Sequence, residues 1–390
     1  SRRSRDQRSA LWVLLALAVN PWHVLLSRWA LESNVLPFML LLGIYCLERT
    51  AEREEWLMGA AAALALSLYA YGTAFFFLLL FLPAASVWLW RGRRTSLKTY
   101  FLSLGIFILL ALPVTLCQLR NALGWGAGKF LWLSLPALSE GRQNATSILG
   151  GGSLTGNFAA LLRLLWTQSD GLLWNGFTPY GLFYGKCGLL LSLTGLAVSL
   201  RERRDVPMLL WLLSAFLACG CIDVNVNRAN MLFLPLVFYQ GRGLQALSSL
   251  LHCRSIPAAA ALLAAACFAF SCFGSYAQRL APCFYDGLCP CIAEASERET
   301  GTKFLSFDVN MPYIYVLFTE QMPPQTFQRS VRYMNPDAPF EWVTAVEGWH
   351  FGREPEGESC AVLRADRVPP AYAVVSRHGE WCVCVPAGEA

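Results

Sequence analysis

The sequence predicts a mainly α-helical, polytopic membrane bundle followed by a small extracytoplasmic α/β domain. The chain has 390 residues, of which 55% are hydrophobic and 15% are charged, whereas soluble domains carry about 25% charged residues. Apolar runs recur from Ala10 to Gly274, and the composition then becomes that of an ordinary soluble protein. We therefore divide the chain into a multi-span membrane region, 1–275, and a soluble domain, 276–390.

About nine apolar segments are candidates to cross the membrane as helices, because a spanning helix needs about 20 apolar residues. The first three are short. The stretches 10–48 and 56–90 are each too long for one helix and are interrupted by polar or glycine-bearing residues, so each is interpreted as a helical hairpin. The segments are 10–21, 34–48, 56–69, 73–90, 99–117, 182–200, 206–222, 231–250 and 255–274.

The basic loops indicate the orientation of these spans. If the spans alternate strictly, the basic segments all fall on one side, which Lys and Arg in short loops identify as cytoplasmic. The strongest are 1–9, with four arginines, 91–98 and 201–204, and weaker ones lie at 49–53 and near Arg254. The opposite side then receives residues 20–34, 69–73, 118–181 and 223–230, and the C-terminal domain.

The long outer segment 118–181 and the C-terminal domain have their own patterns. An amphipathic run, NFAALLRLLWTQ at 157–168, is expected to lie flat on the membrane surface. The sequence NAT at 144–146 is a glycosylation acceptor sequon. In the C-terminal domain, strands are expected at 303–307, 371–377 and 380–385, and helices at 312–321 and 324–334.

The cysteines predict no metal centre. Six of the fourteen lie in the outer domain, where an oxidising compartment permits disulfides whose pairing the sequence does not define. The CPC and CVC motifs lack the usual ligand spacing, and the chain has only four histidines.

Charged residues near the first spans suggest a binding site. Arg28 and Glu32 are four residues apart, so on a helix they share one face, and His23 lies in the same stretch. Unmatched charges are costly at mid-membrane, so the pair lies at the surface or serves a site. A structural pair with a snorkelling arginine is one alternative. We favour a site, since a guanidinium on the outer face can grip a phosphate through two hydrogen bonds.

A second polar cluster precedes the span that starts at Met231. Asn225, Asn227 and Arg228 crowd this segment together with a third asparagine. One asparagine is enough for a helix N-cap, so the group is interpreted as a hydrogen-bonding site for a polar head group.

Two further groups are ambiguous between function and an interfacial aromatic belt. Tyr69 and Tyr71 lie at a predicted outer turn. Asp170, Trp174 and Asn175 lie shortly before a span, where an aromatic ring and amides together suit a sugar or an acceptor.

Four stretches together resemble a known family. They are NPWHVLLSRWALESNVLPFMLLLGIY, LYAYGTAFFFLLLFL, LLWTQSDGLLWNGFTPYGLFY and VNVNRANMLFLPL. The chain resembles bacterial membrane glycosyltransferases of the GT-C superfamily, in the family 39-like branch related to protein O-mannosyltransferases and lipid A aminoarabinose transferases. The resemblance covers most of residues 10–275.

The resemblance implies a GT-C-like helical fold, a polyprenyl-phosphate sugar donor and an inverting transfer at the outer face of a bacterial plasma membrane. Arg28 and Glu32 match an SR-plus-acid pattern near the donor site, and Arg28 and Arg228 would stabilise the departing phosphate. Further candidates to bind the phosphate or sugar of the donor are His23, Tyr69, Tyr71, Asn225 and Asn227. The family's catalytic acid lies in an earlier outer loop, so we expect it upstream of Ser1 and expect an N-terminal part to be missing. No cofactor is certain, a divalent cation is compatible with this chemistry, and no nucleic acid partner is expected.

Three alternatives stay open at this stage. A polysaccharide polymerase or ligase uses similar donors and outer arginines. A lipid-linked oligosaccharide flippase is disfavoured because spans 99–117 and 182–200 are nearly free of charge. A non-catalytic scaffold would not need Arg, Asn and Trp gathered on one face. The acceptor could be a glycan, a lipid or a protein.

Overall fold

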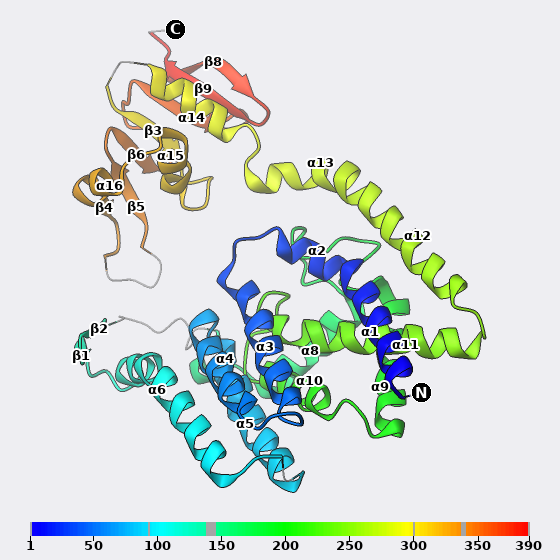
Figure 1. The fold of residues 1–390 in the computed structure, drawn as a ribbon. Coiled ribbons are helices and arrows are strands. Elements are labelled where there is room, and N and C mark those ends of the chain that lie inside the picture. Colours follow the sequence, from blue (N-terminus) through cyan, green and yellow to red (C-terminus); the bar gives the residue numbers. More distant parts are fainter. Residues whose placement is uncertain (1, 93, 138–145, 299–300, 337–340, 389–390) are drawn as a thin grey trace. The chain divides into compact units, whose positions relative to one another are not determined.

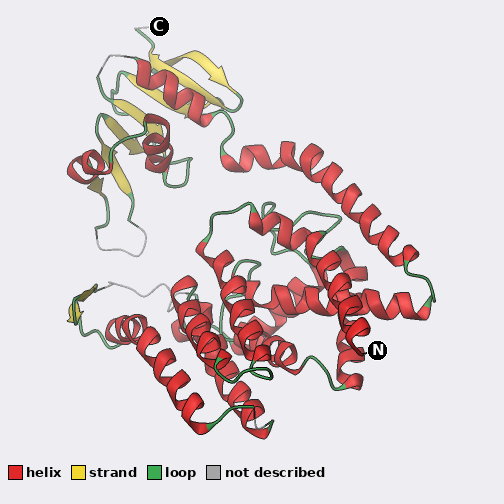
Figure 2. Ribbon diagram, in the orientation of Figure 1, coloured by secondary structure: helices red, strands yellow, loops and turns green. Residues whose placement is uncertain are grey.

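The computed structural model describes residues 2–92, 94–137, 146–298, 301–336 and 341–388. The chain forms two compact units, one reaching Phe273 and one from Gly274 to Ala390 (Figure 1). Figure 2 shows helices throughout the first unit and the strands gathered in the second, apart from the β1–β2 hairpin. The predicted fold class, a helical membrane bundle with a C-terminal α/β region, is confirmed. The sequon asparagine, Asn144, lies outside the described residues.

Every predicted span coincides with a helix of the first unit. Within the described residues, α5, α6 and the stretch Ser255–Phe284 are long and apolar enough to cross a membrane, and α1 with α2 forms a fourth candidate bent by 54°. The full number of nine spans stays a prediction. The helices are α1 (Arg2–Ala18), α2 (Pro21–Ser27), α3 (Val35–Arg49), α4 (Trp56–Ala70), α5 (Thr73–Arg91), α6 (Leu97–Ala122), α8 (Leu154–Thr167), α9 (Gly185–Glu202), α10 (Val206–Cys219), α11 (Phe233–Leu250) and α12 (Ser255–Ser271).

The amphipathic run of the long loop forms α8, as expected. Ahead of it, β1 (Gly128–Phe130) and β2 (Leu133–Leu135) form an antiparallel hairpin that was not predicted from the sequence. The hairpin predicted for the spans 10–21 and 34–48 is not the main contact of either helix, because α1 packs along α11 and α3 packs along α4.

Helices α9 and α11 approach each other at backbone distance. One face of α9 carries only small buried residues, Gly188, Ser192, Gly195 and Ser199, the pattern that lets membrane helices pack closely. A Cβ at Gly195 would lie 1.9 Å from the Tyr239 carbonyl oxygen, and one at Gly243 would lie 2.0 Å from the Leu191 carbonyl oxygen. The Ser192 hydroxyl donates to the Leu236 carbonyl oxygen at 3.0 Å. No side chain fits at Gly195 or Gly243.

Gly195→Ala is therefore expected to destabilise the first unit by about 1–3 kcal/mol, the usual cost of overpacking a tight core. The measurement is the thermal unfolding midpoint of the purified protein in detergent. Gly105→Ala in α6 is the matched control, because no atom lies within 4 Å of its added Cβ. Equal midpoints for the two variants would contradict the close packing of α9 on α11.

Polar side chains link several of the predicted cytoplasmic segments. The guanidinium of Arg242, which is 5% exposed, donates to Glu202 Oε2 at 2.7 Å and to Ser9 Oγ at 2.8 Å, and it lies 3.4 Å from Asp205 Oδ2. Ser96 donates from its backbone N–H to Glu54 Oε2 at 2.5 Å. These contacts join segment 1–9 to 201–205 and the region of 49–54 to 91–98, as expected if each pair lies on one face.

The second unit is built on a seven-stranded sheet of order β4-β5-β6-β3-β7-β9-β8. Strand β3 pairs in parallel with β6 and β7, and every other neighbouring pair is antiparallel. The strands are β3 (Lys303–Ser306), β4 (Arg332–Tyr333), β5 (Val343–Val346), β6 (Trp349–Gly352), β7 (Cys360–Arg364), β8 (Tyr372–His378) and β9 (Trp381–Pro386). The helices are α13 (Ala277–Leu280), α14 (Leu288–Glu297), α15 (Pro312–Glu320) and α16 (Pro324–Ser330).

The three predicted strands of this unit are confirmed as β3, β8 and β9, and the two predicted helices as α15 and α16. The expected helix 324–334 is too long: α16 ends at Ser330, and the chain turns into β4. Helix α14 packs against β7, β8 and β9. It buries Leu288, Cys291, Ile292 and Ala295, which recur at the spacing of one helical face.

All fourteen cysteines are free thiols in this structure. In the second unit, burial raises the pKa of the Cys291 thiol to about 12. Cys382 Sγ and Cys384 Sγ lie 3.4 Å apart on one face of β9. Since the thiolate is the reactive form, a buried thiol such as Cys291 stays protonated and inert at neutral pH.

Candidate functional site

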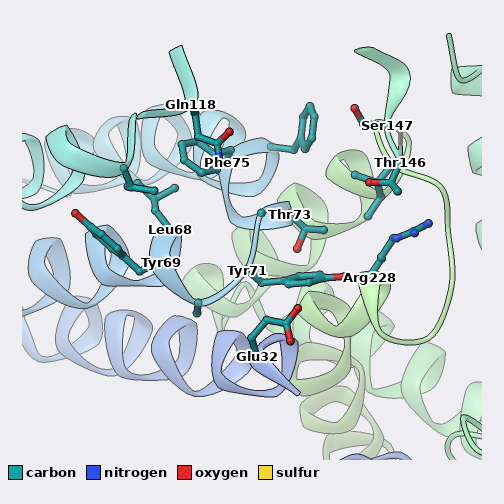
Figure 3. Close-up of a pocket in the computed structure, with 15 residues that line it drawn as sticks. Glu32, Leu68, Tyr69, Tyr71, Thr73, Phe75, Gln118, Thr146, Ser147 and Arg228 are labelled. Carbon is teal, nitrogen blue, oxygen red and sulfur yellow. The ribbon is translucent and has the colours of Figure 1, made fainter. Parts of the chain in front are cut away.

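A cavity of about 350 Å³ in the first unit brings together residues from five separate parts of the chain (Figure 3). Its lining combines polar and charged side chains with apolar ones. Four of the predicted donor-site residues are among them. The lining residues are Glu32, Leu68, Tyr69, Ala70, Tyr71, Gly72, Thr73, Phe75, Phe76, Val114, Gln118, Thr146, Ser147, Ile222 and Arg228.

The turn between α4 and α5 forms one wall. Helix α4 ends because Tyr71 adopts an extended backbone, with φ −159° and ψ 141°, and α5 begins at Thr73. The Tyr69 hydroxyl donates to the Leu110 carbonyl oxygen of α6 at 2.8 Å. The Thr73 hydroxyl is buried and has no hydrogen-bond partner among the described residues. A buried polar group of this kind is costly unless something bonds it, so Thr73 offers a hydrogen bond to a bound molecule.

Glu32 reaches the cavity from a 3-10 turn, η1 (Glu32–Asn34). In Figure 3 its carboxylate lies beside the ring of Tyr71. No described residue forms a hydrogen bond or ion pair with this carboxylate, which leaves both of its oxygens free to accept from a ligand.

Arg28 and Glu32 do not share a helix face, so that prediction is wrong. Helix α2 ends at Ser27, and Arg28 is its C-cap. The Asn34 amide donates to the carbonyl oxygens of Leu26 at 2.8 Å and Trp29 at 3.0 Å. These bonds satisfy carbonyl groups that a continuing helix would otherwise have used, and the chain turns before Glu32.

Arg28 and His23 lie outside the cavity lining. The Arg28 guanidinium lies 3.8 Å from Cys272 Sγ and 5.8 Å from the ring centroid of Phe273. The His23 ring contacts the Leu17 carbonyl oxygen at 3.1 Å through Nδ1 and stacks on Phe233. Their role in donor binding stays a prediction.

Arg228 enters the cavity from a segment far from Glu32 in the sequence, at the start of the 3-10 turn η3 (Arg228–Leu232). Its Nη1 donates to the Asp223 carbonyl oxygen at 3.1 Å and lies 3.9 Å from Asp223 Oδ2. No described residue accepts a hydrogen bond from its Nε or Nη2. The guanidinium is thus anchored on one side and available on the other.

Asn225 and Asn227 belong to the same loop but do not line the cavity. Asn225 Oδ1 accepts a hydrogen bond from the Arg228 backbone N–H at 2.8 Å, whereas Asn227, the N-cap residue of η3, makes no side-chain capping bond. The side-chain oxygen of Asn227 is buried with no partner among the described residues. Asn225 therefore positions Arg228 rather than the ligand.

Asn230 joins the turn that carries Glu32 to the segment that carries Arg228. Its amide donates to the Ser33 carbonyl oxygen at 3.0 Å and to Asn34 Oδ1 at 3.2 Å, and Asn230 is 2% exposed. Residues nearly two hundred positions apart are thereby tied, with Glu32 next to one end of the link and Arg228 close to the other.

Asp170 and Asn175 brace this loop and do not line the cavity. Asp170 Oδ2 accepts from the Asn175 amide at 2.7 Å and from the Val226 backbone N–H at 3.1 Å. Asp170 Oδ1 accepts from the Leu172 backbone N–H at 3.1 Å. Trp174, the third member of this predicted group, is also absent from the lining. Their predicted contact with a sugar or acceptor stays a prediction.

Asp170→Ala is expected to destabilise the loop that carries Arg228 by about 1–3 kcal/mol, because the fully buried Val226 N–H would lose its acceptor. The measurement is limited proteolysis of the folded protein, in which faster cleavage at 223–228 would show that the loop is destabilised. Asp170→Asn, which keeps one acceptor oxygen, is expected to fall between wild type and Asp170→Ala. Wild-type protease resistance in both variants would refute the bracing role.

Four polar residues of the lining were not predicted from the sequence as site residues: Thr73, Gln118, Thr146 and Ser147. Thr146 and Ser147 reach the cavity because their segment pairs with the one before Arg228. The Asp223 N–H donates to the Thr146 carbonyl oxygen at 3.0 Å, and Ser147 and Ile222 form a bridge. Thr146 was visible only as part of the sequon. Gln118 is a polar residue near the C-terminal end of the apolar helix α6, and that contrast could have been used to predict it.

Metal ligands do not gather at this site. Within the part of the chain that the structure describes, no group of three His, Cys, Asp or Glu side chains is placed to hold a metal ion. Among the described residues that line the cavity, Glu32 is the one with a carboxylate.

Comparison with known families tests the resemblance seen in the sequence. Residues 1–125 match the model of the dolichyl-phosphate-mannose-protein mannosyltransferase family. Over this stretch the resemblance to protein mannosyltransferases is confirmed. The matched stretch includes Glu32, Tyr69 and Tyr71, whereas Arg228 lies outside it. Together with the apolar helices, the match identifies the chain as an integral membrane protein.

Among solved structures, the chain is similar to ArnT from Cupriavidus metallidurans, whose crystal structure was determined with undecaprenyl phosphate bound. The two chains share 13% sequence identity with a TM-score of 0.47, over 97% of this chain and 78% of ArnT. No curated protein matches the chain.

Proposed function

We propose that this protein is a membrane glycosyltransferase that moves a sugar from a polyprenyl-phosphate-linked donor to a glycan, lipid or protein acceptor. The observation that carries the proposal is the cavity, where Glu32, Tyr69, Tyr71 and Arg228 meet although the sequence places them in three distant segments. The family that matches residues 1–125 is named for a lipid-linked mannose donor, which agrees with this chemistry.

The two charged walls suit the two polar parts of such a donor. The open side of the Arg228 guanidinium matches a phosphate, which arginine binds through two parallel hydrogen bonds. The Glu32 carboxylate can only accept hydrogen bonds when ionised, so it suits sugar hydroxyls and not the phosphate. A volume of about 350 Å³ falls within the range of about 300–1,000 Å³ that is usual for small-molecule sites.

The prenyl chain of such a donor is matched by apolar surfaces in and beyond the cavity. Leu68, Phe75, Phe76 and Val114 line the cavity beside the polar walls. A second, apolar cavity of about 360 Å³ lies further along α4, α5 and α6, lined by residues such as Leu64, Phe81 and Phe107. A prenyl chain fits these surfaces because it is purely hydrocarbon. Helix α6 exposes large apolar side chains such as Phe101 and Leu109, which suits a surface in contact with lipid.

The chemical step then follows from charge development. An acceptor oxygen attacks the anomeric carbon, the bond from that carbon to the phosphate oxygen breaks, and the electron pair moves onto the lipid phosphate. The acceptor proton goes to a general base. Arg228 stabilises the negative charge that grows on the phosphate, the kind of preorganised electrostatic effect that contributes most to many enzymes. Attack from the face opposite the phosphate inverts the anomeric centre.

We place the cavity and the C-terminal unit at the outer face of a bacterial plasma membrane, because the basic loops indicate that the opposite ends of the helices are cytoplasmic. The test of the function is transfer from a labelled polyprenyl-phosphate mannose or aminoarabinose to membrane acceptors by the full chain in proteoliposomes. Binding of the donor without transfer to any acceptor would favour a carrier or scaffold, and absence of donor binding would overturn the proposal.

A further inference from the structure

The second unit has a cleft of its own, of about 1190 Å³. It lies where the parallel strands β3, β6 and β7 end. Ser306 ends β3, Gly352 ends β6, and Leu363 lies next to the end of β7; all three line the cleft. Ligands of open α/β sheets bind in the crevice outside the carboxyl ends of parallel strands, at the point where connections leave in opposite directions. Strand β3, with β6 on one side and β7 on the other, creates such a point.

The polar residues of the cleft carry balanced charge. Arg353 and Arg367 oppose Asp308 and Glu354, two charges of each sign. Arg367 forms an ion pair with Asp308. Neither Arg353 nor Glu354 has a hydrogen-bond or ion-pair partner among the described residues, and both side chains are exposed. The cleft thus offers a free donor next to a free acceptor and carries no net charge that would select an anion.

Aromatic side chains form the apolar part of the cleft. The rings of Phe307 and Trp342 meet edge to face with centroids 5.4 Å apart, and Trp342 is 38% exposed. The Asn335 side-chain oxygen accepts a hydrogen bond from the Trp342 backbone N–H at 2.6 Å, and the Trp342 carbonyl oxygen accepts from Met334 N–H at 2.8 Å. These two bonds fix the backbone of Trp342, which lies one residue before β5.

We propose that this cleft binds a neutral carbohydrate, with Trp342 as the stacking platform and Arg353 and Glu354 bonding the hydroxyls. A sugar combines apolar C–H faces with hydroxyls that both donate and accept, and the cleft combines an exposed ring with a free donor and a free acceptor. A purely apolar ligand would leave the charged groups of the cleft unpaired. A phosphorylated or carboxylated ligand would find no surplus positive charge in the cleft to balance its own negative charge. The inference goes beyond the proposed function, since it concerns glycan binding in the second unit and not sugar transfer.

The experiment measures binding of fluorescent neutral oligosaccharides of mannose, glucose and N-acetylglucosamine to the full chain in detergent. Wild type is expected to bind at least one of them, and Trp342→Ala is expected to weaken that binding at least tenfold. Phe318→Ala is the matched control, because Phe318 is a more exposed aromatic residue of the same unit, 76% exposed and outside this cleft. It should bind as wild type does.

Two exposed positions keep the test decisive if Trp342→Ala unfolds the second unit. Arg353→Ala and Glu354→Ala remove side chains without partners among the described residues, so folding should survive and binding should weaken severalfold. Binding must also persist in Arg228→Ala, which separates this cleft from the donor cavity. The proposal falls if no neutral oligosaccharide binds, if all the cleft variants bind like wild type, or if only phosphorylated or carboxylated glycans bind.

Discussion

Replacing Arg228 with alanine is expected to lower the affinity for polyprenyl phosphate about 100-fold. Two charge-assisted hydrogen bonds, each worth at least about 1.5 kcal/mol, would be lost, and 1.4 kcal/mol corresponds to a factor of ten. The loss should be the same with and without an attached sugar, because the guanidinium addresses the phosphate. Binding of labelled polyprenyl phosphate to the purified protein in nanodiscs measures it.

Arg163→Ala in α8 is the control for Arg228→Ala. Arg163 is exposed and lies outside the cavity lining. Its replacement therefore tests whether the loss of any one positive charge weakens the binding of an anionic lipid. Arg228→Lys should recover part of the affinity, since lysine keeps the charge but not the two-pronged geometry. If Arg228→Ala and Arg163→Ala bind polyprenyl phosphate equally, the phosphate does not lie at Arg228.

Replacing Glu32 with alanine is expected to act on the sugar alone. The carboxylate has no protein partner among the described residues, so the fold should be unchanged while two hydrogen bonds to sugar hydroxyls disappear. We expect the affinity for the sugar-bearing donor to fall about 100-fold and the affinity for polyprenyl phosphate without sugar to stay at the wild-type value. Competition between the two lipids in one binding assay gives both values.

Glu32→Gln should fall between wild type and Glu32→Ala, because the amide keeps one acceptor oxygen but not the charge. Glu55→Gln is the control, since Glu55 is an exposed acid at the start of α4, the end remote from the cavity-lining residues of that helix. Tighter binding of the sugar-free lipid to Glu32→Ala would instead mean that Glu32 repels the phosphate and that the sugar lies elsewhere.

Much of the helical unit could be predicted from the sequence because hydropathy is a local signal. All nine predicted segments are helices, and the three predicted strands of the second unit are present. The strands β4, β5, β6 and β7 were missed. Strand β3 finds its parallel partners more than forty residues later in the sequence, at Trp349 and Cys360. No short window of the chain contains that pairing.

The candidate site was foreseen in part. Residue chemistry alone selected Glu32, Tyr69, Tyr71 and Arg228, which the fold brings to one cavity. Arg28 was paired with Glu32 by assuming an unbroken helix, and the Asn34 side chain breaks it by bonding carbonyl oxygens of the preceding turn. Asp170 and Asn175 were predicted to contact a sugar or an acceptor, and that role stays a prediction. In the fold they bond each other, and Asp170 also accepts a hydrogen bond from the backbone of the loop that presents Arg228.

The Asn230 link to Ser33 and Asn34 has a consequence for how this site could change over evolution. Because a buried amide ties the Glu32 turn to the Arg228 segment, a shift in one wall displaces the other. Substitutions that reshape the sugar side would therefore disturb the phosphate side unless they spare this asparagine and both of its acceptors. The apolar residues of the cavity lining on α4, α5 and α6, such as Leu68, Phe75 and Val114, form no part of that link. The preference for the length of the prenyl tail can therefore change through ordinary apolar replacements. The preference for the head group can change only if the Glu32 turn and the Arg228 segment are exchanged together.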